Sequence, residues 1–218
     1  MLSKRYFIGD SCICWSFGDE ISAGLSSRII SLYRQLKAEP FMQKLGALDL
    51  VPSYTELAIY FNPLECSVET ITQAVEELVA ERFQSIDPMT FTLESPGSTH
   101  IIPVIYNGAD LQRVADFHNL TINEVIDRHV NGKYVVAMIG FLPHFPYLIG
   151  LDKSLETPRL DTPRKIVPAG AVAIGGGQTG IYPQQSPGGW NILGITHPDN
   201  LFSIEPGDSV IFKKVDTL

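Results

Sequence analysis

The sequence predicts an α+β protein with two domains, a ferredoxin-like α/β sandwich over residues 1–95 and a β-barrel over residues 96–218. The first domain is indicated by segments of strand and helix period that follow one another in the order βαββαβ. The second is indicated by short apolar segments separated by long stretches rich in glycine and proline, without helical period beyond about residue 133.

The elements of the first domain follow from the spacing of apolar residues and from turn residues between them. Ser67 is a typical N-cap for the second of two helices, which carries Val68, Ile71 and Val75 on one face. The expected elements are a strand over 5–17, a helix over 21–37, strands over 47–51 and 56–61, a helix from 68, a strand over 90–93 and a linker over 94–98.

The second domain begins with two short helices and continues mainly as strands. Asp110 is expected to cap a helix that ends at His118. Thr121 and Glu124 form a capping-box pattern that opens a helix to about His129. The expected strands lie over 101–106, 134–139, 171–174, 190–196 and 210–213.

Composition excludes several classes of function. The chain has 218 residues and a net charge of −8 without a basic stripe, which argues against nucleic acid as a partner. No apolar run approaches the roughly 20 residues that span a bilayer, and the N-terminus is too short for a signal-peptide core, so we expect a cytoplasmic protein without a membrane partner. Cys12, Cys14 and Cys66 lack metal-ligand spacing and are expected to be buried thiols, and no metal site is predicted.

The segment GGGQTG at residues 175–180 formally satisfies the dinucleotide-binding pattern. That site needs a helix after the third glycine, but Pro183 blocks one, and the lysine of a phosphate-binding P-loop is missing. Two interpretations remain, a tight turn or a glycine nest whose N–H groups meet an anion. Ser186 stands beside glycines without the nucleophile-elbow pattern, which argues against a catalytic serine.

Three further side chains are candidates for chemistry. His144 stands between two prolines and is either a catalytic histidine or a hydrogen-bonded loop residue. Arg159 and Arg164 each follow Thr-Pro, which holds a guanidinium on a restricted backbone where it could grip a carboxylate or phosphate. The alternative is a pair of surface arginines that form ion pairs with Glu156 and Asp161.

Taken in order, these segments resemble the allophanate hydrolase subunit 1 family, which includes the B-subunit of the prokaryotic 5-oxoprolinase and the sporulation-kinase inhibitor KipI. The likeness runs over nearly the whole chain and is weaker in its N-terminal half. The motifs that carry it are GFLPHFPYLIGL (140–151), TPR (157–159), VPAGAV (167–172), GGQTGIYP (176–183) and SPGGW (186–190), with FGD (17–19), LVPSY (50–54) and NP (62–63) in the first half.

This resemblance implies a small N-terminal α/β domain followed by a cyclophilin-like β-barrel. It also implies a non-autonomous subunit of an enzyme that opens the lactam of 5-oxoproline to glutamate with ATP, acting with a homologue of the family's subunit 2 (the C-subunit of 5-oxoprolinase) and a third subunit. Gln178 and His144 are then the catalytic candidates. The substrate-binding candidates are Arg159, Arg164, Gly177, Thr179, Tyr182, Phe145 and Ser186.

Two other functions are compatible with the same resemblance, an inhibitor that binds a sensor histidine kinase and the carboxyltransferase half of a biotin-dependent, urea-type carboxylase. The chain departs from many members at two places. It has His144 where they have glycine, and residues 106–111 lack their longer Gly-Pro insertion. Both departures concern the expected pocket and therefore the substrate.

Overall fold

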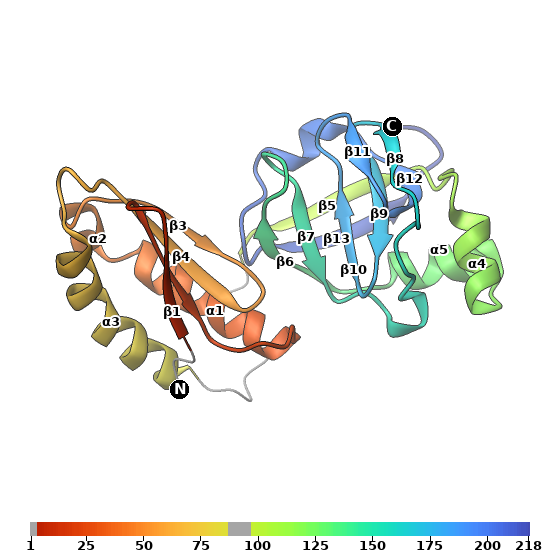
Figure 1. Ribbon diagram of the computed structural model, residues 1–218. Coiled ribbons are helices and arrows are strands. Elements are labelled where there is room, and N and C mark those ends of the chain that lie inside the picture. Colours follow the sequence, from red (N-terminus) through yellow and green to blue (C-terminus); the bar gives the residue numbers. More distant parts are fainter. Residues whose placement is uncertain (1–3, 87–96) are drawn as a thin grey trace. The chain divides into compact units, whose positions relative to one another are not determined.

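The computed structural model describes residues 4–86 and 97–218 (Figure 1). The chain divides into two compact units, Met1–Ser95 and Pro96–Leu218. Each unit has a hydrophobic core of its own, and each is described by itself.

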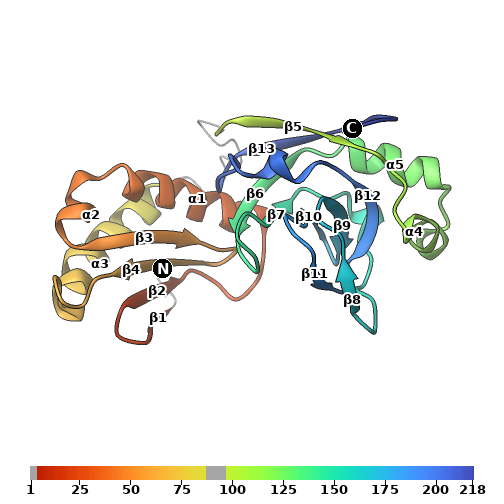
Figure 2. The same ribbon diagram turned by 90° about the horizontal axis from the view of Figure 1, so that it is seen from above.

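The N-terminal unit is a four-stranded antiparallel sheet with the strand order β1-β2-β4-β3. Trp15 and Ile59 of the sheet join Ile29 of α1 and Val75 of α3 in one buried cluster, so both helices pack on the same face (Figure 2). The elements are β1 (Lys4–Ile8), β2 (Cys12–Ser16), α1 (Ala23–Lys37), α2 (Pro40–Lys44), β3 (Ala47–Pro52), β4 (Glu56–Phe61) and α3 (Val68–Ser85).

The single strand predicted over residues 5–17 is wrong, because the chain folds there into the hairpin β1–β2. Gly9 has a φ of +64°, a backbone conformation that glycine adopts without strain, and it turns the chain between the two strands. As a result β1 occupies the sheet edge beside β2. The strand predicted over residues 90–93 lies outside the described residues.

Two local predictions for this unit are confirmed. The Ser67 hydroxyl accepts the backbone N–H of Thr70 and caps α3. Cys12 and Cys14 lie on one face of β2 as buried free thiols, and burial raises the pKa of both thiols.

The C-terminal unit is built on a seven-stranded sheet with the order β12-β9-β10-β7-β6-β13-β5. The two end strands meet through a bridge between Ile105 and Ile195, which makes the sheet a nearly closed barrel. Its elements are β5 (Thr99–Val104), α4 (Leu111–His118), α5 (Ile122–Val130), β6 (Tyr134–Ile139), β7 (Pro146–Ile149), the 3₁₀ turn η1 (Lys153–Leu155), β8 (Arg164–Val167), β9 (Ala171–Gly175), β10 (Gln178–Ile181), β11 (Ser186–Gly188), β12 (Asn191–Ile195), η2 (Pro198–Leu201) and β13 (Ser209–Lys214).

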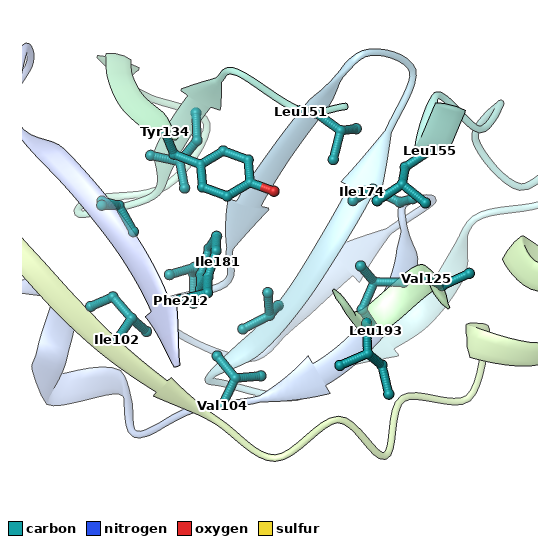
Figure 3. Packing of buried hydrophobic residues seen from close by; sticks show 14 of the residues in the cluster. Ile102, Val104, Val125, Tyr134, Leu151, Leu155, Ile174, Ile181, Leu193 and Phe212 are labelled. Carbon is teal, nitrogen blue, oxygen red and sulfur yellow. The ribbon is translucent and has the colours of Figure 1, made fainter. Parts of the chain in front are cut away.

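Apolar side chains from strands all around the sheet fill the barrel (Figure 3). Phe212 of β13, Ile181 of β10 and Val104 of β5 meet there at 0–1% exposure, and Val125 joins them from α5. The Thr121–Glu124 capping box that opens α5 is confirmed. Asp110 precedes α4 as predicted, but its carboxylate makes no capping bond because other groups bind it.

Between residues 140 and 190 the sequence predicts long loops around one strand over residues 171–174, and that prediction misses most of the strands there. Besides the expected β9, four further strands, β7, β8, β10 and β11, lie in this stretch, and β8 pairs with β11 as a separate two-stranded sheet. Each has only three or four residues, and three of them contain glycine or proline. Such short segments cannot show the alternation of apolar and polar residues by which a strand is recognised in a sequence. Across the described part of the chain, no helix is long and apolar enough to cross a membrane.

Candidate functional site

A cavity of about 250 Å³ lies on the C-terminal unit where β7, β10 and β11 approach the segment before β8. Its wall is mainly aromatic and contains one cation. It is lined by Phe141, Phe145, Tyr147, Arg159, Leu160, Pro163, Tyr182, Pro187, Gly188, Gly189 and Trp190, and we call it the aromatic pocket.

The aromatic side chains pack edge to face, which fixes their positions. Phe145 stands at 5.1 Å and 89° to Tyr182 and at 5.8 Å and 83° to Trp190, measured between ring centroids and planes. Tyr147 meets Trp190 at 5.7 Å and 76°. Such arrangements bring a positive ring edge to a negative ring face and favour one geometry over others. The pocket is therefore a preformed apolar cage.

Two glycines of the predicted motifs make room for these rings. A Cβ at Gly175 would lie 2.7 Å from atoms of the Trp190 indole, and one at Gly188 would lie 2.4 Å from the Tyr182 hydroxyl oxygen. Both distances are shorter than real Cβ contacts allow. The glycine-rich sequence thus serves the seating of aromatic side chains in addition to turning the chain.

Arg159 supplies the positive charge of the pocket. Its guanidinium carbon lies 5.7 Å from the centroid of Trp190, a cation–π arrangement. The backbone around it is anchored, since the Asn191 amide donates to the Pro158 carbonyl at 3.0 Å and the Leu160 N–H donates to the Gly189 carbonyl at 2.7 Å. The alternative interpretation, an ion pair with Glu156 or Asp161, does not hold for Arg159, which makes no ion pair among the described residues.

Tyr182 brings a hydroxyl to the same pocket. Burial raises the pKa of this phenol, against the opposing effect of a hydrogen bond from the Trp190 backbone. The hydroxyl therefore keeps its proton at neutral pH and can donate a hydrogen bond.

Arg164 has a different place from Arg159. Its Nη2 donates to the buried carboxylate of Asp110 at 2.6 Å, and the other oxygen of that carboxylate accepts the Ile192 N–H at 2.7 Å. Arg164 also pairs with Gly188 across β8 and β11, which places it beside the pocket without lining it. Through Asp110, which precedes α4, this arginine links β8 to β12.

The glycine segment adopts the tight turn, one of the two interpretations the sequence leaves open. Gln178 pairs with Gly175 across the β9–β10 hairpin, and the Gly176 N–H donates to the Thr157 carbonyl at 2.8 Å. Gly177 is exposed at the tip. The turn therefore lies against the segment that leads to Arg159, but Gln178 and Gly177 are not among the pocket-lining residues.

Two further candidates lie outside the pocket wall. Ser186 is buried in β11, and its hydroxyl donates to the Pro187 carbonyl at 3.2 Å. His144 is exposed and packs edge-on against Phe202 at 5.1 Å. Thus Phe145, Arg159 and Tyr182 are brought together in the pocket, whereas the other sequence candidates are not among its lining residues.

The loop that carries His144 holds two non-glycine residues at positive φ, Phe141 at +66° and His144 at +64°. This conformation costs a residue with a Cβ about 1–2 kcal/mol. Phe141 lies at the pocket rim, where it meets Phe145 at 5.6 Å. The backbone strain thus accompanies the placement of an aromatic side chain at the pocket.

Thr179 belongs to a buried polar chain that the sequence does not reveal. Its hydroxyl donates to the Ala173 carbonyl at 3.0 Å, so its oxygen accepts Nε2–H of His129, also at 3.0 Å. Nδ1 of His129 then accepts the Tyr106 hydroxyl proton at 2.7 Å. His129 is fully buried, and burial lowers its pKa to about 3.

Sequence reasoning identifies Phe145 and Tyr182 but misses the rest of the aromatic wall. The position of Trp190 at the start of a strand favours a core residue, and Tyr147 and Phe141 stand out only as parts of motifs. The available signal is the occurrence of aromatic residues within the glycine- and proline-rich motifs. Among the residues that the structure describes, no group of three histidine, cysteine or acidic side chains is placed to hold a metal ion.

Comparisons with known proteins relate this chain to one family over most of its length. Residues 4–207 match the family model described as "carboxyltransferase domain, subdomain C and D". The chain is 37% identical to the 5-oxoprolinase B-subunit of Haemophilus influenzae, covering 97% of this chain and 93% of the relative, and 35% identical to that of Bacillus subtilis, covering 89% and 84%. The solved structure titled TTHA0988 is 32% identical with a TM-score of 0.76, and the match covers 95% of this chain but 40% of that one.

Proposed function

This chain belongs to the family of carboxyltransferase subdomains C and D, and on that premise we propose that it is the B-subunit of a 5-oxoprolinase. The observation that carries this proposal is its 33–37% identity to three proteins named as B-subunits of 5-oxoprolinase, over 89–97% of the chain. The reaction opens the lactam of 5-oxoproline to glutamate. A lactam is an unactivated amide, which is consistent with coupling to ATP.

The described residues suit one part of this chemistry. Arg159 supplies a fixed cation and Tyr182 a hydroxyl donor at one cage, groups that can bind a carboxylate and polarise a carbonyl. We assign ATP handling to a subunit 2 homologue and a third subunit, because the glycine segment of this chain forms a hairpin turn and lacks the lysine of a P-loop.

The experiment is reconstitution of the complete enzyme. This chain is co-expressed with its subunit 2 and third-subunit homologues, and ATP hydrolysis that depends on 5-oxoproline is measured. We expect Arg159→Ala to lower kcat/KM at least about tenfold, and Lys165→Ala, which removes an exposed charge outside the pocket, to leave it unchanged. Gln178→Ala tests the catalytic role of Gln178, and His144→Ala tests that of His144. Absence of 5-oxoproline-dependent hydrolysis in the complex that carries the wild-type chain contradicts the proposal.

A carboxyltransferase half is the second candidate, since the matching family model is named for that reaction. It predicts biotin-dependent carboxyl transfer by the same complex once a biotin carrier is added. Inhibition of a sensor histidine kinase stays a prediction of the family resemblance. Co-purification of this chain with a kinase instead of a subunit 2 homologue would favour it.

A further inference from the structure

The aromatic pocket combines features that suit one charge state of a small ligand. We propose that it binds 5-oxoproline on this chain alone, with the lactam ring against Trp190 and the carboxylate on Arg159, and that it rejects glutamate, the product of ring opening. The inference rests on the proposed function, and it assigns substrate selection and product release to this chain.

The size and wall of the pocket define the class of ligand. Its volume of about 250 Å³ lies just below the range of roughly 300–1,000 Å³ typical of sites for drug-sized molecules. Tyr147 and Trp190 meet edge to face, with 5.7 Å between their ring centroids, and so form one continuous aromatic wall of the pocket. A small, compact ring fits such a cage better than a long polar chain, because the cage offers few partners for polar atoms along its walls.

The charge of the pocket selects a single anionic group. Arg159 is the only charged residue that lines the pocket, and it makes no ion pair within the described part of the chain. Its planar guanidinium can hold a carboxylate with two parallel hydrogen bonds. Among the described residues, no carboxylate lines the pocket to receive an ammonium group.

Ring opening adds charged groups to the ligand, and this pocket disfavours binding of additional charges. Water adds its oxygen to the lactam carbonyl carbon, the carbon–nitrogen bond breaks, and both protons of the water pass to the nitrogen. At neutral pH the product carries a second carboxylate and an ammonium group in place of the neutral lactam. Both new charges would have to leave water for an aromatic wall without a partner, which is costly. Glutamate is therefore expected to bind at least about tenfold more weakly than 5-oxoproline, a difference of about 1.4 kcal/mol.

The test is direct binding to the full chain purified without partner subunits. Isothermal titration and saturation-transfer NMR are performed with 5-oxoproline, glutamate, proline and 2-pyrrolidinone. We expect 5-oxoproline to bind most tightly. Proline should bind more weakly because its ring carries an ammonium group, and 2-pyrrolidinone should bind more weakly because it lacks the carboxylate. Saturation should reach the ring protons of 5-oxoproline from aromatic protons of the protein.

Matched variants locate the carboxylate. Arg159→Ala should weaken the binding of 5-oxoproline at least about tenfold and leave the affinity for 2-pyrrolidinone unchanged. Lys165→Ala should change neither affinity. Arg159 is exposed, so its replacement leaves the core intact. Equal affinity for glutamate and 5-oxoproline, or an Arg159→Ala chain that binds 5-oxoproline normally, would overturn the inference. Failure of the lone chain to bind 5-oxoproline also overturns it, whereas ATP hydrolysis by the reconstituted complex decides the proposed function separately.

Discussion

His129 should make the C-terminal unit sensitive to acid. Its imidazole has no exposed surface, and both ring nitrogens are used, Nδ1 by the Tyr106 hydroxyl and Nε2 by Thr179. Only the neutral ring with its proton on Nε2 satisfies all three groups, because Thr179 donates its own proton to Ala173. A second proton, on Nδ1, would break the hydrogen bond that Nδ1 accepts from the Tyr106 hydroxyl. It would also place a positive charge in the core.

The size of the effect follows from the two pKa values of His129. Burial lowers the pKa of the folded state to about 3, whereas an unfolded histidine has a pKa of about 6.5. Below about pH 6.5 the unfolded chain binds a proton that the folded chain refuses, so stability falls as the pH falls, until the loss levels off near about pH 3. At about pH 5 the loss is about 1.5 pH units times 1.4 kcal/mol, or about 2 kcal/mol.

Urea unfolding of the wild-type chain and of His129→Gln at about pH 7.5 and about pH 5 measures this loss. Both proteins carry Trp15→Phe, so that Trp190 reports the C-terminal unit alone. Glutamine does not titrate, and groups common to both proteins cancel in the difference. We expect the difference in free energy of unfolding between the wild-type and His129→Gln proteins to shrink by about 2 kcal/mol at the lower pH. A difference that is the same at both pH values would refute the assignment of acid sensitivity to His129.

Substitutions at three other positions test the pocket and the residues that support it. Gly188→Ala places a Cβ 2.4 Å from the Tyr182 oxygen, so it should displace that ring and destabilise the protein by about 1–3 kcal/mol, measured by urea unfolding. Asp110→Ala leaves the buried Ile192 N–H without its acceptor and should speed the hydrogen exchange of that amide, whereas Asp110→Asn, which keeps an acceptor oxygen, should do so far less. His144→Gly should be about 1 kcal/mol more stable than His144→Ala in thermal unfolding, because glycine adopts a φ of +64° without strain.

Sequence predicts best where one local signal determines one element. The hydroxyls of Ser67 and Thr121 cap helices at the predicted positions, and residues 134–139 form the strand expected from their apolar run. It predicts less well where several elements share one run of residues. Cys12 to Phe17 continues an apolar pattern begun at Tyr6, and the chain reversal at Gly9 becomes clear from the antiparallel pairing of β1 with β2.

In the candidate site, too, local sequence identifies single residues, whereas tertiary packing decides which of them lie together. Phe145, Arg159 and Tyr182 belong to separate motifs, and only the packing of β7, β10 and β11 shows that they face one cavity. Arg164 follows the same Thr-Pro pattern as Arg159, yet it pairs with Asp110, a residue 54 positions away. Local sequence gives two arginines the same restricted backbone, but the partner that neutralises one of them is supplied by the tertiary fold.

The composition of the pocket argues that it is part of a larger catalytic site. Hydrolysis needs a group that takes a proton from water, and the described lining residues include no aspartate, glutamate, histidine, lysine or cysteine. The guanidinium of Arg159 has only N–H donors and cannot accept a proton, and the raised pKa of Tyr182 keeps the phenol proton in place at neutral pH. These side chains can bind and polarise a lactam, but they cannot activate the water that opens it. We therefore expect the isolated chain to bind 5-oxoproline without forming glutamate even when ATP is present, and activity to appear only when a partner subunit brings a base to the pocket. Glutamate formation by the isolated chain would show that the base lies within it.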